Sequence, residues 1–195
     1  MKKILSLLLF LVTCGAFAQT TYFFDKKGKK TVMRDDTVDI IVVDERLTYA
    51  EDGKDWEKYI RFKDLDYAVI GPMLFKSFKL TTAKGKTKKE TAYFVITESE
   101  EKKLLCYTYT VVGKYTSIDY YNIYFVDNNN QILDYIEFNT SNIFIGARAK
   151  ITPFMNKHFS NCETVMNRFN EFEDNDDKHL NILGFFSKPY HLKCN

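Results

Sequence analysis

The stretch from Glu90 to Phe138, ETAYFVITESEEKKLLCYTYTVVGKYTSIDYYNIYFVDNNNQILDYIEF, decides the fold of this chain. Apolar and polar residues alternate along it in separate runs, which is the period of half-buried strands. Short polar turns connect consecutive runs, and turns this short require antiparallel pairing because parallel neighbours need long crossovers. We therefore predict a β-meander with strands at Glu90–Thr97, Leu104–Val112, Tyr120–Val126 and Gln131–Phe138.

Strand signals continue from this stretch towards the N-terminus. Short β-branched and aromatic runs predict strands at Thr21–Asp25, Thr31–Met33, Thr37–Asp44, Tyr59–Phe62 and Met73–Thr81. The Lys-rich turns 26–30 and 84–89 are interpreted as hairpin tips whose charge discourages sheet-to-sheet aggregation.

Helix signals replace strand signals after Phe138. Thr140, Ser141 and Asn142 are good N-cap residues, so a short helix is expected from there towards Pro153. Ser160 and Glu163 then have the spacing of a capping box. An apolar stripe at three- and four-residue spacing follows, formed by Cys162, Val165, Met166, Phe169 and Phe172. A third apolar segment, Leu180–Phe186, is expected to be a helix or a strand.

These patterns predict an α+β fold. An antiparallel β-meander sheet, for which a curled or barrel-like form is an option, carries two or three C-terminal helices packed on it. No repeat or linker divides the chain, so residues 19–138 form the meander and residues 139–195 the helical part of the same domain.

Residues 1–18 have the order of a cleavable secretory signal peptide. Lys2 and Lys3 precede the apolar run Ile4–Val12, and Ala16-Phe17-Ala18 matches the residues that signal peptidase reads. Cleavage there makes the protein periplasmic or secreted and starts it at Gln19. The alternative is a lipid anchor on Cys14, which is less favoured because Thr13 is large for that processing site.

Composition excludes some classes of protein. The chain has 28 Lys+Arg against 26 Asp+Glu, and without Lys2 and Lys3 the two counts are equal. A neutral chain is not expected to bind nucleic acid, which needs a net basic surface. After the signal, no apolar run is long enough for a transmembrane helix.

Three features together resemble small exported β-rich proteins of the flavobacterial kind. They are a signal ending in Ala18-Gln19, Tyr-rich hairpins, and a helical region opening on Phe159-Ser160-Asn161-Cys162. The resemblance implies an exported protein with this fold, and it matches no characterised family.

The cysteines allow three interpretations. Cys106, Cys162 and Cys194 follow the signal, and in an oxidising compartment we expect a disulfide between Cys162 and Cys194. The alternatives are unpaired structural cysteines, or a zinc site formed by His158, Cys162, His191 and Cys194. Catalysis by Cys162 with His158 is disfavoured because Cys162 lies on an apolar helix stripe.

No catalytic or cofactor-binding motif is recognisable, and no cofactor is expected. Tyrosine offers apolar area with a polar tip, so a Tyr-rich sheet face suits recognition. The candidates for a binding surface are Tyr107, Tyr109, Tyr120 and Tyr124. We therefore expect a non-catalytic binding module for a protein or glycan of the cell envelope. The alternative is a hydrolase-type enzyme whose site is assembled from dispersed residues.

Overall fold

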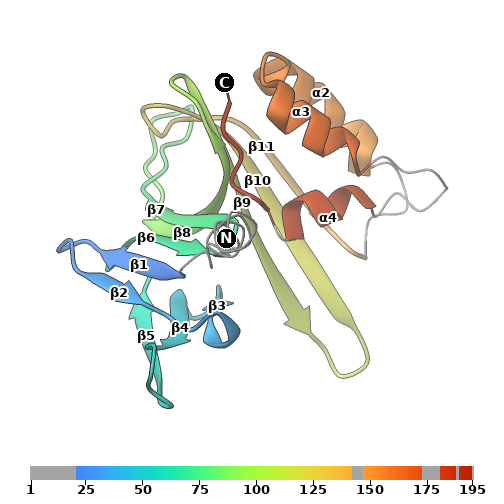
Figure 1. Ribbon diagram of the computed structural model, residues 1–195. Coiled ribbons are helices and arrows are strands. Elements are labelled where there is room, and N and C mark those ends of the chain that lie inside the picture. The colour runs from blue at the N-terminus through green and yellow to red at the C-terminus, as the bar shows by residue number, and fades with distance from the viewer. Residues whose placement is uncertain (1–20, 142–146, 173–180, 188, 195) are drawn as a thin grey trace, which may run out of the picture.

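The computed structural model describes residues 21–141, 147–172, 181–187 and 189–194. Its regular structure consists of an eight-stranded antiparallel sheet, a three-stranded sheet and three helices at the C-terminal end (Figure 1). The predicted α+β fold with a β-meander is confirmed.

The large sheet has the spatial order β11-β10-β9-β8-β7-β6-β1-β2. Its edges, β11 and β2, do not pair with each other, so the sheet is open rather than a closed barrel. The strands are β1 (Tyr22–Asp25), β2 (Lys30–Val32), β6 (Leu65–Ile70), β7 (Met73–Phe78), β8 (Thr91–Glu98), β9 (Lys102–Val112), β10 (Ser117–Asp127) and β11 (Ile132–Asn139).

The small sheet has the order β3-β4-β5. Its strands are β3 (Asp39–Ile41), β4 (Arg46–Ala50) and β5 (Glu57–Arg61). The prediction of one strand over Thr37–Asp44 was too long, because β3 pairs with β4 over three residues only and a turn closed from the Glu45 N–H to the Val42 carbonyl follows. A 3-10 turn, η1 (Asp35–Thr37), precedes β3, and neither β4 nor β6 was predicted.

The helices are α2 (Ala147–Phe159), α3 (Glu163–Asn170) and α4 (Asn181–Ser187). Pro153 does not end the first helix but lies inside it. The capping box was wrong too: the N-cap of α3 is Cys162, which makes no side-chain cap bond. No helix among the described residues is both long and apolar enough to cross a membrane.

One face of the large sheet carries two separate layers. The three helices pack on β8–β11, where Ile123, Phe125 and Cys106 meet the helical side chains Ile151, Val165, Phe169 and Phe186. The small sheet packs on β1, β6, β7 and β8, where Phe23, Phe75 and Phe94 meet Leu47 and Tyr49. Figure 1 shows these layers at the two ends of the sheet.

No helix of the described residues packs on the opposite face of the large sheet. Its apolar cluster includes Tyr93, Leu105 and Tyr124 and is joined by Leu80, from the connection between β7 and β8. This connection crosses to the far edge, where the Thr81 N–H bonds to the Asn130 carbonyl and the Ile132 N–H bonds to the Thr81 carbonyl. The connection therefore covers one end of this face, and the other end holds the candidate site.

Candidate functional site

The predicted disulfide is present. Cys162 and Cys194 are bonded, with their Cα atoms 5.1 Å apart, a separation typical of disulfides. The bond ties the C-terminal tail to the start of α3. Cys106 remains a free thiol in the core, where its S–H donates to the Phe186 carbonyl at 3.3 Å. Burial raises the pKa of this thiol, so it is unreactive in the folded protein.

The other two zinc candidates have partners of their own. His158 Nε2 lies 2.5 Å from an Asp134 carboxylate oxygen, and His191 Nδ1 lies 3.1 Å from the Val95 carbonyl. Within the described part of the chain, no three His, Cys, Asp or Glu side chains gather as metal ligands do. Because both sulfurs are bonded to each other, neither the zinc site nor a Cys162 nucleophile has a thiolate to use.

The four tyrosine candidates lie on the sheet face opposite the helices. Their rings form a continuous series of contacts in which successive centroids are 4.7 to 6.1 Å apart. The series runs Tyr120, Tyr109, Tyr107, Tyr93, Tyr124, Tyr135. Within it, Tyr109 and Tyr120 are directly opposite in the β9–β10 pairing and stack at 4.8 Å with 4° between their planes. A rigid aromatic surface results.

The members of this series differ in exposure. Tyr107, Tyr109 and Tyr120 are half-buried and Tyr135 is 41% exposed; these four are named the tyrosine surface below. Tyr124 is buried, and the Lys88 ammonium lies 4.9 Å from its ring centroid. Tyr124 therefore lies on the same face but is covered, and it does not form part of the surface.

The hydroxyl groups of Tyr107, Tyr109 and Tyr135 are neutral. Burial raises the pKa of Tyr107 and Tyr109, and burial together with Glu137 raises that of Tyr135. The Tyr135 hydroxyl lies 2.6 Å from Asn122 Oδ1 and 2.7 Å from a Glu137 carboxylate oxygen. The surface thus offers hydrogen-bonding tips on apolar rings.

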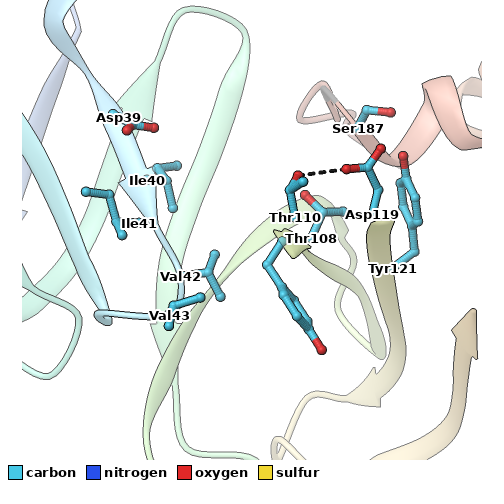
Figure 2. Close-up of a pocket in the computed structure, with 11 residues that line it drawn as sticks. Asp39, Ile40, Ile41, Val42, Val43, Thr108, Thr110, Asp119, Tyr121 and Ser187 are labelled. Atoms are coloured by element: carbon cyan, nitrogen blue, oxygen red, sulfur yellow. Dashed lines mark hydrogen bonds between the residues drawn. The ribbon is translucent and has the colours of Figure 1, made fainter. Parts of the chain in front are cut away.

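A cavity of about 510 Å³ opens on the other side of the β9–β10 hairpin. Beyond Cys106, β10 is the one described strand that pairs with β9, so no strand of the described structure borders the other edge of β9. Residues 39–43 form the facing wall and Ser187, at the end of α4, a third side (Figure 2). The cavity therefore lies where the helices and the small sheet leave a gap on the covered face.

The described lining of this cavity combines carboxylate and hydroxyl groups with apolar side chains. Its polar groups are carboxylates and hydroxyls, and no His, Cys or Lys is among the described residues that line it. Thr110 donates to Asp119 at 2.7 Å, and the Ser187 hydroxyl donates to the Leu183 carbonyl at 2.7 Å. Among the described residues of the lining, none is placed as a base for the Ser187 hydroxyl.

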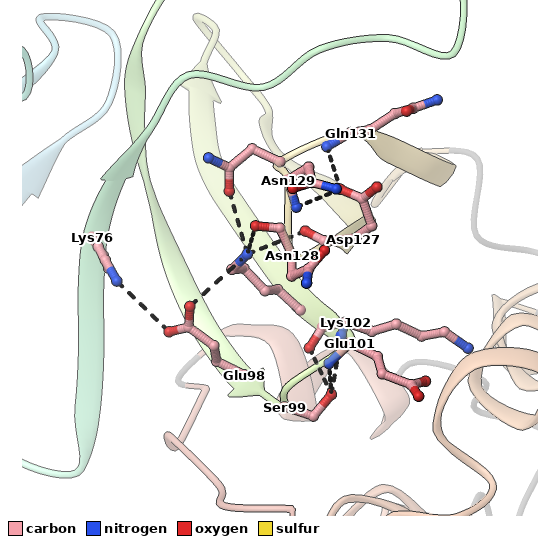
Figure 3. Close-up of polar contacts among 11 residues, drawn as sticks. Lys76, Glu98, Ser99, Glu101, Lys102, Asp127, Asn128, Asn129 and Gln131 are labelled. Atoms are coloured by element: carbon pink, nitrogen blue, oxygen red, sulfur yellow. Dashed lines mark hydrogen bonds and ion pairs between the residues drawn. The ribbon is translucent and has the colours of Figure 1, made fainter.

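A buried lysine joins two hairpin turns elsewhere on the sheet (Figure 3). The Lys103 ammonium donates to the carbonyls of Asp127 and Asn128 at 3.1 Å each and to Asn130 Oδ1 at 3.4 Å. Glu98 is 4.0 Å away, and burial lowers the pKa of Lys103. An ammonium has three donors, and all are used, so this cluster is structural.

No family model, curated protein or solved structure matches this chain. The tyrosine surface and the cavity are therefore interpreted from their own geometry.

Sequence reasoning found the tyrosines but not their surroundings. The period-two pattern placed Tyr107 and Tyr109 on one face, yet it gave no sign that Lys88 lies over Tyr124. It also missed the cavity, because the wall of residues 39–43 meets β9 only through the packing of the small sheet.

Proposed function

We propose that this protein is an exported, non-catalytic binding module that recognises a partner protein of the cell envelope through its tyrosine surface. The supporting observation is the asymmetry of the large sheet. Helices and a second sheet cover one face, whereas Tyr107, Tyr109, Tyr120 and Tyr135 lie half-buried or exposed on the other.

An exposed valine extends this surface on the same hairpin. Val111 lies two residues beyond Tyr109 on β9, hence on the same face, and is 46% exposed. Aromatic rings with polar tips beside apolar side chains are typical of the centre of protein interfaces. Because the tyrosines are held by one another and by the sheet, little side-chain entropy is lost when a partner binds.

The ring geometry favours a protein over a sugar. A sugar ring packs best on an exposed flat aromatic face. Tyr109 and Tyr120 each cover one face of the other's ring. The ring of Tyr107 also contacts that of Tyr109, with the two centroids 5.7 Å apart. The exposed parts are therefore ring edges and hydroxyl tips, which suit a polypeptide with backbone hydrogen-bonding groups.

Site-specific photocrosslinking tests the proposal. A photoreactive phenylalanine analogue replaces Tyr109, Tyr135 or, as control, Tyr115, which is 85% exposed at the tip of the same hairpin. In cells that export the protein, we expect the same crosslinked protein from positions 109 and 135 and not from 115. If the crosslinked protein is a second copy of this chain, the result also supports the tyrosine surface as the binding site.

A double variant provides the matched test. Tyr109→Ser with Tyr120→Ser should reduce capture of the crosslinked partner by purified protein at least tenfold, while Tyr115→Ser leaves capture unchanged. Both variants must keep the circular dichroism spectrum of the wild type. Equal capture by both, or the same crosslinks from position 115, would refute the proposed function.

A further inference from the structure

A groove on the small sheet has an excess of positive charge. It has a volume of about 520 Å³ and is lined by Arg46, Arg61, Lys63 and Lys89, by the carboxylates of Asp44 and Glu45, and by the Tyr59 ring. We name it the cationic groove. A smaller hollow of about 450 Å³ shares Tyr59, Arg61 and Lys63 with it and adds Ile60 and Asp64, so the groove continues along β5.

The two acids inside the cationic groove already have partners. Asp44 pairs with Arg46 at 3.1 Å, and Glu45 pairs with Lys89 at 2.6 Å. Arg61 and Lys63 are exposed, and no described residue forms a hydrogen bond or ion pair with their side chains. Two positive charges in the groove are therefore uncompensated, apart from Asp64 in the adjoining hollow.

The pairing of β4 with β5 places like charges together. Arg46 and Arg61 are directly opposite each other in the antiparallel register, and like charges in that position destabilise a sheet. The Arg46 Nε–H is also buried without a partner among the described residues. An anion that accepts hydrogen bonds from both guanidinium groups would remove the repulsion.

The Tyr59 ring indicates which kind of molecule carries the anionic group. It is 54% exposed and faces the Arg46 guanidinium at 5.7 Å. The Tyr59 ring differs from those of the tyrosine surface because no other aromatic ring among the described residues stacks on it. It can therefore pack against a sugar ring. The volume of the groove suits a ligand of that size.

We infer that the cationic groove binds an acidic polysaccharide, through a carboxylate or sulfate group of one sugar residue that lies between the guanidinium groups of Arg46 and Arg61, with Lys63 beside them, while the ring of that residue packs on Tyr59. The adjoining hollow holds the next residue of the polymer. This site lies on a different sheet from the tyrosine surface and does not depend on it.

Binding of purified protein to immobilised polymers at low ionic strength tests the inference. The probes are polygalacturonate for carboxylate, dextran sulfate for sulfate, and unmodified dextran as the neutral control. We expect binding to at least one acidic polymer, none to dextran, and weakening as salt is added. Binding to anionic lipid vesicles but to neither acidic polymer would overturn the inference.

Charge-matched variants locate the site. Arg61→Gln with Lys63→Gln should weaken polymer binding at least tenfold. Lys84→Gln with Lys86→Gln removes the same charge from an exposed turn and should change binding less than twofold. Equal losses in the two variants would show diffuse attraction and overturn the site.

Two further variants test the ring contact and the independence of the groove from the tyrosine surface. Tyr59→Ala should weaken polymer binding several-fold, whereas unchanged binding would overturn the contribution of ring packing. Tyr109→Ser with Tyr120→Ser should bind polymer as the wild type does, so failure here and failure of the proposed function are distinguishable. Thermal melting curves confirm that each variant is folded.

Discussion

At the residue scale, Phe169 lies in the core that joins the helical layer to the large sheet. Its side chain is fully buried, and its ring meets that of Phe185 edge-on at 5.6 Å. The Arg148 guanidinium lies 5.3 Å from the same ring. The apolar stripe of Val165 and Phe169 expected from the sequence therefore faces the core, as Val165 is fully buried too.

Replacing this ring tests how firmly the helices are attached. Phe169→Ala should lower the free energy of unfolding by about 3–5 kcal/mol, because a cavity remains where the ring was. Urea unfolding followed by circular dichroism measures it. Tyr115→Ala, at an exposed hairpin tip, is the control and should change stability by less than about 0.5 kcal/mol. An unchanged midpoint for Phe169→Ala would mean that α3 contributes nothing to the core.

Arg46 and Lys103 are cationic side chains that are not fully exposed to solvent, and they differ in their hydrogen-bond partners. Lys103 has an acceptor for each donor and stabilises two turns. Arg46 faces Arg61 across a strand pair and keeps a buried donor without a partner in the described structure. The donors of Lys103 are all satisfied. The buried donor of Arg46 is not, and this is one reason why the groove is proposed as a binding site.

At the element scale, the C-terminal tail extends the large sheet. The Leu192 N–H bonds to the Ile96 carbonyl at 2.7 Å, and Leu192 bridges in parallel to Thr97. The tail thereby borders β8 where β7 no longer pairs with it, since the β7–β8 pairing ends at Phe75 and Phe94. So short a segment has few contacts of its own, and the Cys162–Cys194 bond holds it in place.

Reduction of this bond should release the tail. The cysteines are 32 residues apart, and the loss of this cross-link should cost about 3–4 kcal/mol in the chain-entropy account. Urea unfolding with and without a phosphine reductant measures the cost, and hydrogen exchange at Leu192 reports the release.

Thiol counting provides the control for that experiment. In protein that begins after the signal, one thiol, Cys106, should react with a maleimide, and only after denaturation, since it is buried. Three reactive thiols without reductant would contradict the disulfide. Cys106→Ala should retain the full effect of the reductant on stability.

At the scale of the whole molecule, the two faces of the large sheet are covered to different extents. Two layers cover one face, and the other carries the tyrosine surface and the connection through Leu80. The cationic groove lies on the small sheet instead. The molecule therefore presents two surfaces of different chemistry, one aromatic and the other positively charged, and we propose a separate ligand for each.

Both proposals assume export, which the first residues predict. Residues 1–18 lie outside the described part of the chain, as do Cys14 and the cleavage site. The intact mass of protein recovered from the envelope or medium should correspond to a chain that begins at Gln19 without acyl groups. A mass that begins at Cys14 with attached acyl chains would show a lipoprotein instead.

The sequence by itself determined the local structure. Period-two alternation and short polar turns are local properties, so they fixed the strands of the meander and their antiparallel order. Asn130 adopts a positive φ of 64° in the turn before β11, in keeping with the tolerance of Asn for that conformation. The disulfide was also predictable, because few cysteines were present to pair.

Only the tertiary structure decided where these elements meet. The helix end at Phe159 was missed, because packing of Ile151 and Met155 on the sheet carries α2 through Pro153. The Arg46–Arg61 opposition depends on a register between two strands of which one was not predicted. Such contacts join residues far apart in sequence, and no local pattern encodes them. For that reason the candidate tyrosines were readable from the chain, whereas the cationic groove was not.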